Sequence, residues 1–240
     1  KEMLEVIARG TGTSMEDCAI VPRQSFRLKL ISDLLKALGD PDGEFYRTVE
    51  KGVPIGVDVE LPRTPAVFAE KTKWALDEPV GAPDGEVANY QSVSGHEEAV
   101  KELFKSEAAE GLMLNISDAE AKREFGDRLH VAALGVVAEK EKFRVVHDGT
   151  HGVLVNHRIR VRDQARSPTA GEVRTLMRER WVDFGGAKQF APGGDVSKAH
   201  RRVLVRREDW GLQACRLEPG SLWVNCVGTY GIGSAGYWWA

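Results

Sequence analysis

Asp195 is a carboxylate whose neighbours suit metal-assisted phosphate chemistry. In the stretch GGDVSKA, two glycines precede Asp195 and mostly small residues follow it. Nucleotidyl transfer uses carboxylates that hold two Mg²⁺ ions about 4 Å apart. An aspartate at a strand end, followed by free backbone N–H groups at Lys198 and Ala199, is suited to holding a metal and a triphosphate. The alternative is that Asp195 only caps the next turn.

Two further segments carry residue types that suit the same chemistry. Lys142 and Arg144 occupy alternate positions of an expected strand, so both project from one face and can clamp a triphosphate. Tyr230 lies in a glycine-rich run that lets backbone approach a ligand closely, with glycines at 228, 231, 233 and 236. The alternatives are a solvent-facing strand edge for the first segment and a simple turn into a helix for the second.

In this order, the three segments resemble motifs of the reverse transcriptase family of retroelements. Residues 142–156 (KFRVVHDGTHGVLVN) are similar to the fingers motif K-W-R-x-x-x-D-x-R-x-x-N. Residues 195–200 (DVSKAH) are similar to palm motif A, and residues 228–236 (GTYGIGSAG) to palm motif B. The motif-bearing part covers residues 88–240, whereas residues 1–87, helical and proline-rich, resemble only the less defined upstream region.

The resemblance implies a fold and a set of roles. The fold would be α+β, with polymerase-like fingers and a partial palm whose helices pack on an antiparallel or mixed sheet. Asp195 would be the catalytic, metal-binding carboxylate, and Val196 would lend its carbonyl to the metal. The nucleotide-binding residues would be Lys142, Arg144, Lys198, Ala199, His200 at the sugar-gate position, Tyr230 and Gly231. The metal would be Mg²⁺, with Mn²⁺ as an alternative, and the partners a dNTP and an RNA or DNA template-primer.

The sequence also departs from the family pattern. His200 replaces the usual Tyr or Phe, and Thr229 and Gly236 replace prolines of motif B. The chain contains no Asp-Asp pair, so the family's Y-x-D-D motif is absent. We therefore expect a fragment of an RNA-directed DNA polymerase, a nucleotidyltransferase, that is inactive as given. A longer gene product would supply the missing motif.

Charge distribution supports a second hypothesis. Residues 1–139 carry 16 Lys and Arg against 26 Asp and Glu, whereas residues 140–240 carry 17 against 10. The basic half suits a polyanion, so the alternative function is a non-catalytic nucleic-acid-binding remnant. Its phosphate contacts would be Arg158, Arg160, Arg162, Arg166, Arg201 and Arg202. A third hypothesis is that the acidic residues 1–87 dock another protein.

Composition limits the setting of the protein. Three scattered cysteines form neither a disulfide framework nor a zinc site, which favours a reducing, intracellular location, cytoplasmic or nuclear. No apolar run approaches the roughly 20 residues of a membrane span, so no membrane partner is expected. The oligomeric state is left open.

Periodicity and turn signals predict the elements that must position these residues. Helices are expected at 24–38, 43–51, 95–110, 169–183 and from 233 onward, and Ser117 with Glu120 matches a capping box. Strands are expected at 129–138 and 142–147, then one leading into Asp195, then a hairpin formed by 212–217 and 222–227. The proline- and glycine-rich stretch 52–95 is expected to be a loop-rich linker.

Overall fold

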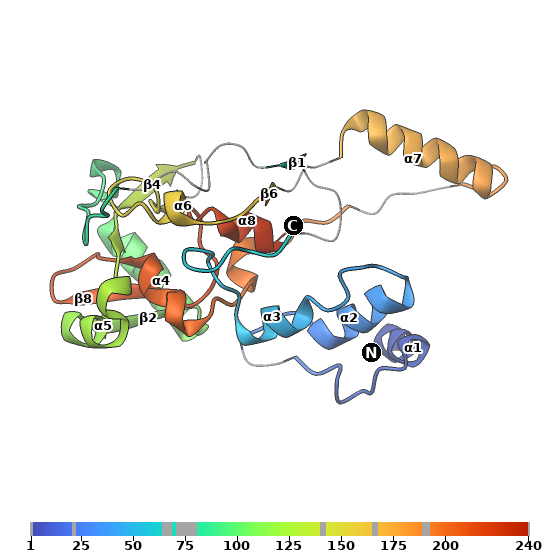
Figure 1. Ribbon diagram of the computed structural model, residues 1–240, viewed down its shortest axis with the longest axis horizontal. Helices are drawn as coiled ribbons and strands as arrows, with labels where there is room; N and C mark the ends of the chain where they lie inside the picture. Colours follow the sequence, from blue (N-terminus) through green and yellow to red (C-terminus); the bar gives the residue numbers. More distant parts are fainter. Residues whose placement is uncertain are drawn as a thin grey trace.

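The computed structural model has mixed α+β architecture, and its described residues form a mixed four-stranded sheet, two two-stranded pairs and surrounding helices (Figure 1). It describes residues 2–20, 23–63, 69–70, 81–139, 143–164, 168–188 and 193–239. Lys142 and Arg166 lie outside these ranges, so their predicted roles stay predictions. In the described part of the chain, no helix is long and apolar enough to cross a membrane.

The central sheet has four strands in the order β2-β8-β7-β3. Antiparallel pairing joins β2 to β8 and β8 to β7, whereas β7 and β3 run parallel. The strands are β2 (Met113–Ser117), β3 (Val131–Ala132), β7 (Ala214–Cys215) and β8 (Ser221–Asn225). The hairpin predicted around Pro219-Gly220 is thus confirmed, because β7 and β8 pair antiparallel on either side of that turn.

A second pair of strands forms a separate ribbon. Strand β4 (Leu134–Ala138) pairs antiparallel with β5 (Phe143–His147), in a register that sets Leu134 opposite His147. Both contain the β-branched and apolar residues from which they were predicted. Residues 140–142 of the turn that joins them lie outside the described residues.

Helices α4 (Glu97–Ala109) and α5 (Asp118–Phe125) support the sheet. In α4, Phe104 is buried and its ring lies 5.4 Å from that of Trp223 on β8. The predicted capping box begins α5, since Ser117 and Glu120 each accept a hydrogen bond from the other's backbone N–H. The Phe104–Trp223 contact holds α4 against β8, and the buried Ala121 and Phe125 hold α5 against the core.

Residues upstream of position 87 share the core with residues downstream of it. Val53 N donates to Leu204 O at 2.8 Å, and Ile55 N donates to the buried carboxylate of Asp209 at 2.7 Å. Helices α1 (Glu2–Thr11), α2 (Leu28–Ala37) and α3 (Tyr46–Lys51) form a group beside this core (Figure 1). The last two match predicted helices in shortened form, whereas α1 was not predicted.

The remaining elements are short except for α7. They are β1 (Ala69–Glu70), β6 (Asp163–Gln164), α6 (Val155–Arg158), α8 (Ser234–Trp239) and the 3-10 turns η1 (Gln91–Val93), η2 (Gly126–Arg128), η3 (Ala199–Arg202) and η4 (Arg207–Gln213). Helix α7 (Ala170–Asp183) starts at the predicted place, where Thr169 and Glu172 form a second capping box. None of its residues is buried, and it extends away from the sheet (Figure 1).

The expected strand leading into Asp195 is wrong for the residues that the structure describes there. Residues 187–188 and 193–196 have no strand pairing, and 189–192 are not described. Asp195 and Val196 are both exposed in this irregular segment. Two glycines and a proline just before Asp195 favour such irregular backbone, because glycine weakens a strand and proline cannot donate to a ladder.

Candidate functional site

Backbone and amide hydrogen bonds join the fingers-like segment to the glycine-rich loop. His147 N, at the end of β5, donates to Tyr230 O at 3.1 Å. The side-chain amide of Asn156 donates to Gly231 O at 2.7 Å and accepts from Gly233 N at 2.8 Å. Two segments that lie some seventy residues apart in the sequence are therefore held at one place.

The segment after Asp195 joins the same assembly. Gly228 N donates to Val203 O at 2.8 Å, and Leu204 forms an isolated antiparallel bridge with Val227. The rings of His200 and Tyr230 lie 5.1 Å apart between centroids. All three segments singled out in the sequence thus meet, and the glycine-rich loop is the element that contacts the other two.

Gly231 is required by this close approach. Its φ is +106°, which L side chains rarely adopt, and a Cβ at this position would lie 1.8 Å from His147 O. By contrast, a Cβ at Gly236 in α8 would meet no atom within 4 Å. The loop can therefore lie against β5 only with glycine at position 231.

A cavity of about 350 Å³ opens where the three segments meet. It lies between α4, β5, the turn at Lys198–Arg201 and strands β7 and β8. Its walls include three aromatic rings, those of Phe104, Phe143 and Tyr230. Arg144, Lys198 and Tyr230, all predicted to bind nucleotide, line this one cavity.

Cationic side chains stand at the exposed rim of the cavity. The Arg144 side chain is 59 % exposed and lies 3.0 Å from a carboxylate oxygen of Glu139. Lys198, in the left-handed region at φ 56°, lies 3.2 Å from Glu110 and 4.0 Å from Glu107. Because exposed ion pairs are weak, both cations remain able to exchange their carboxylate for a ligand phosphate.

The floor of the cavity is buried and polar. Arg201 is 4 % exposed; its guanidinium forms an ion pair with Glu107 and donates to Asn225 Oδ1 at 2.6 Å. His147 is 3 % exposed, and burial lowers the pKa of its imidazole to about 4, with the nearby charge of Asp148 opposing the shift. The floor therefore combines one neutralised ion pair with a neutral imidazole.

Asp148 holds the turn that follows β5. Its carboxylate accepts from Thr150 N at 2.9 Å, from His151 N at 3.1 Å and from the phenol of Tyr90. Partial burial alone would raise the pKa of this carboxyl, but the hydrogen bonds prevail and lower it to about 2. Asp148 is therefore ionised and serves as a turn anchor next to the cavity.

Asp195 does not line the cavity, although Lys198 three residues later does. Among the described residues, no group of three or more His, Cys, Asp and Glu side chains is placed to hold a metal ion. The carboxylate in the cavity lining, that of Glu107, forms an ion pair with Arg201. The described donors therefore do not fit a two-metal centre, and no catalytic step can be derived through one.

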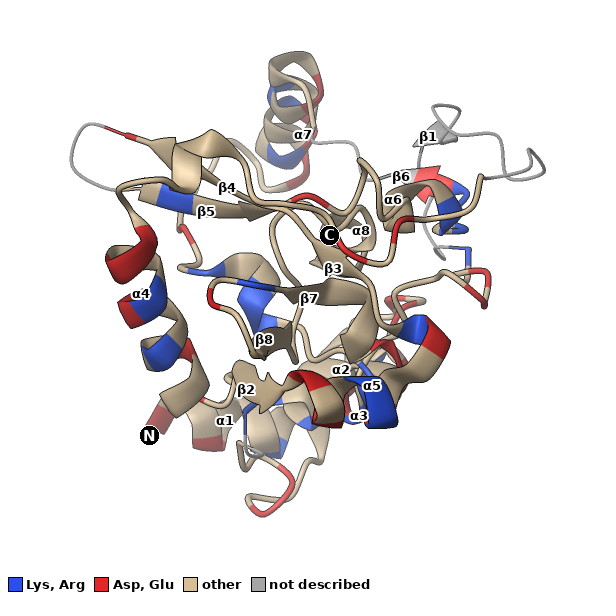
Figure 2. Cartoon of the chain, turned by 90° about the vertical axis from the view of Figure 1, so that its left-hand side faces the viewer, with Lys and Arg blue, Asp and Glu red and all other residues tan. Residues whose placement is uncertain are grey.

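The basic residues of the nucleic-acid hypothesis are only partly on the surface. Arg201 was expected to contact phosphates, but the structure corrects this placement, since its side chain is buried. Arg158 lies 3.2 Å from His130 Nε2, Arg162 pairs with Glu60, and Arg202 donates to Ser25 Oγ at 2.7 Å. Arg160 is exposed. In the cartoon of Figure 2, the Lys and Arg positions on this side of the molecule are interspersed with Asp and Glu positions.

Sequence reasoning missed the residues that form the cavity floor and one that orders its rim. Glu107 and Asn225 follow no motif, because they come from α4 and β8 and reach Arg201 only through the fold. Asn156 ends the fingers-like motif 142–156, and that motif is the sequence signal for it. No pattern in the sequence marks His147 as buried.

No protein-family model matches the sequence, and no curated protein matches it either.

Proposed function

We propose that this chain is the fingers and part of the palm of a reverse-transcriptase-like, RNA-directed DNA polymerase of a retroelement. In this proposal, the cavity beside β5 receives the incoming nucleotide. The observation that carries it is the convergence of three distant segments, each chosen from its sequence motif, around one 350 Å³ cavity.

The charges at the rim agree with this assignment. Arg144 is exposed at the cavity mouth, where its guanidinium can bind two oxygens of a triphosphate. Lys198 adds a second cation to the lining of the cavity, and Tyr230 adds an aromatic ring. In this proposal, the residues at the rim bind the nucleotide. Metal-dependent nucleotidyl transfer to a primer 3′-hydroxyl would need carboxylates that the described residues do not bring to this cavity.

The alternative of a non-catalytic nucleic-acid-binding remnant has less support. Its proposed contacts include Arg201, which is buried, and Arg162, which is paired with Glu60. Arg201 would have to leave an interior partner before it gained phosphate contacts, whereas the Arg162–Glu60 pair is exposed. Arg144 is also paired, with Glu139, but that pair lies at the exposed rim of the cavity.

Titration with a fluorescent dATP analogue tests the proposal. We expect saturable binding by the full chain, weakened about tenfold by Arg144→Ala through loss of a charge-assisted contact. The matched control is Arg160→Ala, which removes an exposed arginine outside the cavity lining and should leave binding unchanged. Absence of binding by the unmodified chain, or equal losses in the two variants, would rule out this cavity as the nucleotide site.

A further inference from the structure

We infer that helix α7 docks an acidic amphipathic helix of a partner protein. Every residue of α7 is exposed, and the helix extends away from the sheet (Figure 1). None of its residues lines the cavity beside β5. The inference is therefore independent of the proposed nucleotide site, and either can fail without the other.

The exposed side chains of α7 have the composition of a protein–protein interface. Val173, Leu176, Met177 and Trp181 lie at helical spacing and are between 43 % and 55 % exposed. The helix has three arginines and no lysine. Tryptophan, methionine and arginine are enriched at the centre of such interfaces, whereas lysine is depleted. An apolar stripe of this kind on an exposed helix indicates a protein partner that covers it.

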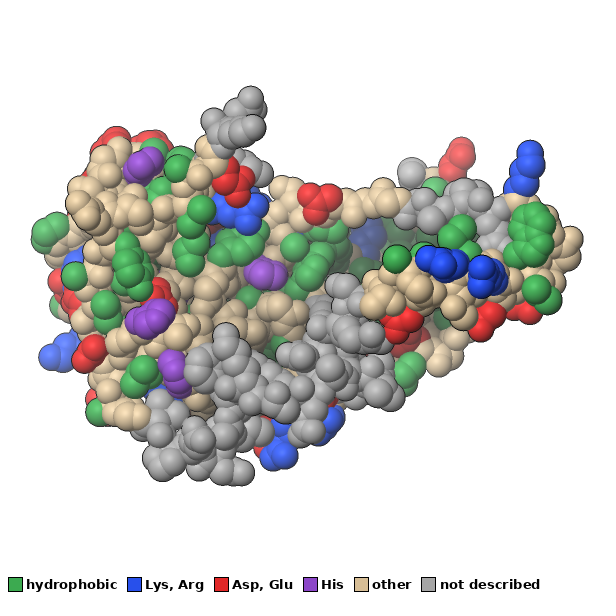
Figure 3. All heavy atoms as spheres, turned by 90° about the horizontal axis from the view of Figure 1, so that it is seen from above, with side chains coloured by type: hydrophobic (Ala, Val, Ile, Leu, Met, Phe, Trp, Pro, Cys, Tyr) green, Lys and Arg blue, Asp and Glu red, His purple; other side chains and the backbone are tan. Residues whose placement is uncertain are grey.

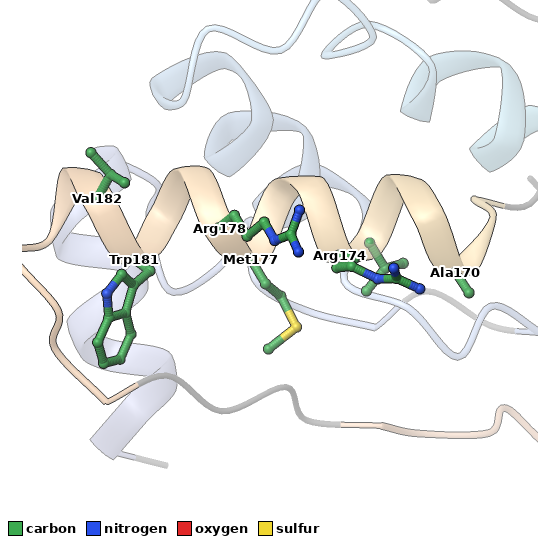
Figure 4. Close-up of a pocket in the computed structure, with 7 residues that line it drawn as sticks. Ala170, Arg174, Met177, Arg178, Trp181 and Val182 are labelled. Carbon is green, nitrogen blue, oxygen red and sulfur yellow. The ribbon is translucent and has the colours of Figure 1, made fainter.

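Two arginines add positive charge to this apolar stripe. Arg174 and Arg178 come from successive turns of the helix and line the same pocket as Met177 and Trp181 (Figure 4). Both arginines are exposed, and neither has an ion-pair partner among the residues that the structure describes. A carboxylate of a partner can therefore accept their hydrogen bonds without displacing an internal partner.

The acidic side chains of α7 lie on its other side. At 3.6 residues per turn, Glu172, Glu179 and Asp183 fall opposite Trp181. Their charges cancel those of the three arginines over the helix as a whole, but not on the side that carries Met177 and Trp181. The complementary surface is therefore one that combines apolar side chains with carboxylates.

Other occupants fit this side of α7 less well. A nucleic acid would use the arginines but leave Val173, Leu176 and Met177 without apolar contacts. A lipid surface needs a face without charges to enter the acyl chains, and Arg174 and Arg178 interrupt this one. Two copies of α7 packed antiparallel would set the same arginines of the two chains beside each other. An acidic amphipathic helix instead sets apolar anchors against the stripe and carboxylates against the arginines.

Fluorescence anisotropy with a labelled helical peptide tests the inference on the full chain. The peptide has about 20 residues, with leucines spaced i, i+3, i+4 and i+7 and glutamates on both flanks. The matched control peptide has lysine in place of every glutamate. We expect saturable binding of the glutamate peptide, about tenfold weaker binding of the lysine peptide, and a loss of affinity as the salt concentration is raised.

Variants of α7 locate the contact. Trp181→Ser should weaken binding of the glutamate peptide about tenfold through loss of an aromatic anchor. The double variant Arg174→Glu with Arg178→Glu should reverse the preference and bind the lysine peptide more tightly than the glutamate peptide. Glu179→Gln, on the opposite side of the helix, is the matched control and should bind as the unmodified chain does. Because the replaced side chains are exposed, all variants should keep the fold, which circular dichroism checks.

Absence of saturable binding by the glutamate peptide, or equal affinity of this peptide for the unmodified chain and for Trp181→Ser, would overturn the inference. Binding of a labelled oligouridine that the double arginine variant abolishes, with no peptide binding, would assign α7 to nucleic acid instead. A monomer–dimer equilibrium in sedimentation that Trp181→Ser abolishes would assign it to a second copy. Trp181→Ser should leave dATP binding unchanged, so failure of the nucleotide site is seen separately.

Discussion

Two regions of this molecule, the cavity and helix α7, place arginines and aromatic side chains in one lining but in opposite settings. At the cavity, Arg201 is buried against Glu107 and is held by Asn225. On α7, Arg174 and Arg178 are exposed beside Trp181 and Met177, which are themselves 55 % and 47 % exposed. Figure 4 shows Met177 and Trp181 projecting from the same side of that helix. In the space-filling view, hydrophobic and basic side chains lie together at that end of the molecule (Figure 3).

The contrast shows that local sequence forms a helix without deciding what covers it. Helix α7 has a complete capping box and the predicted apolar positions, including Val173 and Leu176, yet these remain 43 % and 55 % exposed. The cavity region has shorter elements and weaker local signals, but its hydrogen bonds connect distant parts of the chain. Stability is therefore expected to depend far more on the cavity region than on α7.

The largest effect is expected at Arg201. Replacing it with methionine leaves the Glu107 carboxylate without its main partner in the interior and should lower the free energy of unfolding by about 3 kcal/mol. Arg174→Met on α7 is the matched control, with an expected change within about 0.5 kcal/mol. Urea denaturation followed by tryptophan fluorescence measures both. Similar losses in the two variants would remove the contrast between the regions.

The second largest loss of stability is expected for Gly231→Ala. The added Cβ would meet His147 O at 1.8 Å and would sit at a φ of +106°, so we expect a loss of about 3 kcal/mol or a partial opening of the loop. Gly236→Ala adds the same methyl group to α8 where nothing lies within 4 Å, and should be neutral or slightly stabilising. Thermal melting of the pair measures the difference. Equal melting temperatures would mean that the loop does not lie against β5.

Acid should then destabilise the cavity region through His147. Its pKa is about 4 in the folded protein and near 6.5 when unfolded, so the unfolded state binds more protons between these values. Stability should fall as pH decreases from about 6.5 to 4, by up to about 3 kcal/mol from this group. His147→Phe should reduce this pH dependence. Urea denaturation at pH 7 and at pH 5 gives the free energy of unfolding of the unmodified chain and of His147→Phe. An equal change of this free energy with pH in the two proteins would contradict a buried, neutral imidazole at His147.

The smallest effect is expected at Trp181 on α7. Trp181→Ser should change the free energy of unfolding by less than about 1 kcal/mol, because more than half of the side chain is already exposed. Phe104→Ala beside the cavity should cost about 3 kcal/mol or more, since Phe104 is buried against Trp223. Comparing their chemical denaturation midpoints sharpens the contrast. A large loss at Trp181 would show that the helix face is covered in solution.

Local signals in the sequence predicted many of the elements but not how they are placed. The helix at Glu97–Ala109, the capping box at Ser117, the helix that starts at Thr169 and the hairpin around Gly220 follow from periodicity and turn residues within a few positions. The strand expected before Asp195 fails for the described residues 187–188 and 193–196, where no other strand pairs with the chain. Pairing is a tertiary property.

The sequence by itself was enough to select the residues at the cavity rim as candidates for ligand binding and the glycine-rich loop as a site of close approach. It also predicted where capped helices begin, because caps and periodicity are local. Only the tertiary structure decided that Arg201 is interior, that Glu107 and Asn225 meet it, and that Asp195 lies outside the cavity lining. The physical reason is that burial and pairing depend on which segments meet across the fold, and no local pattern encodes the partner.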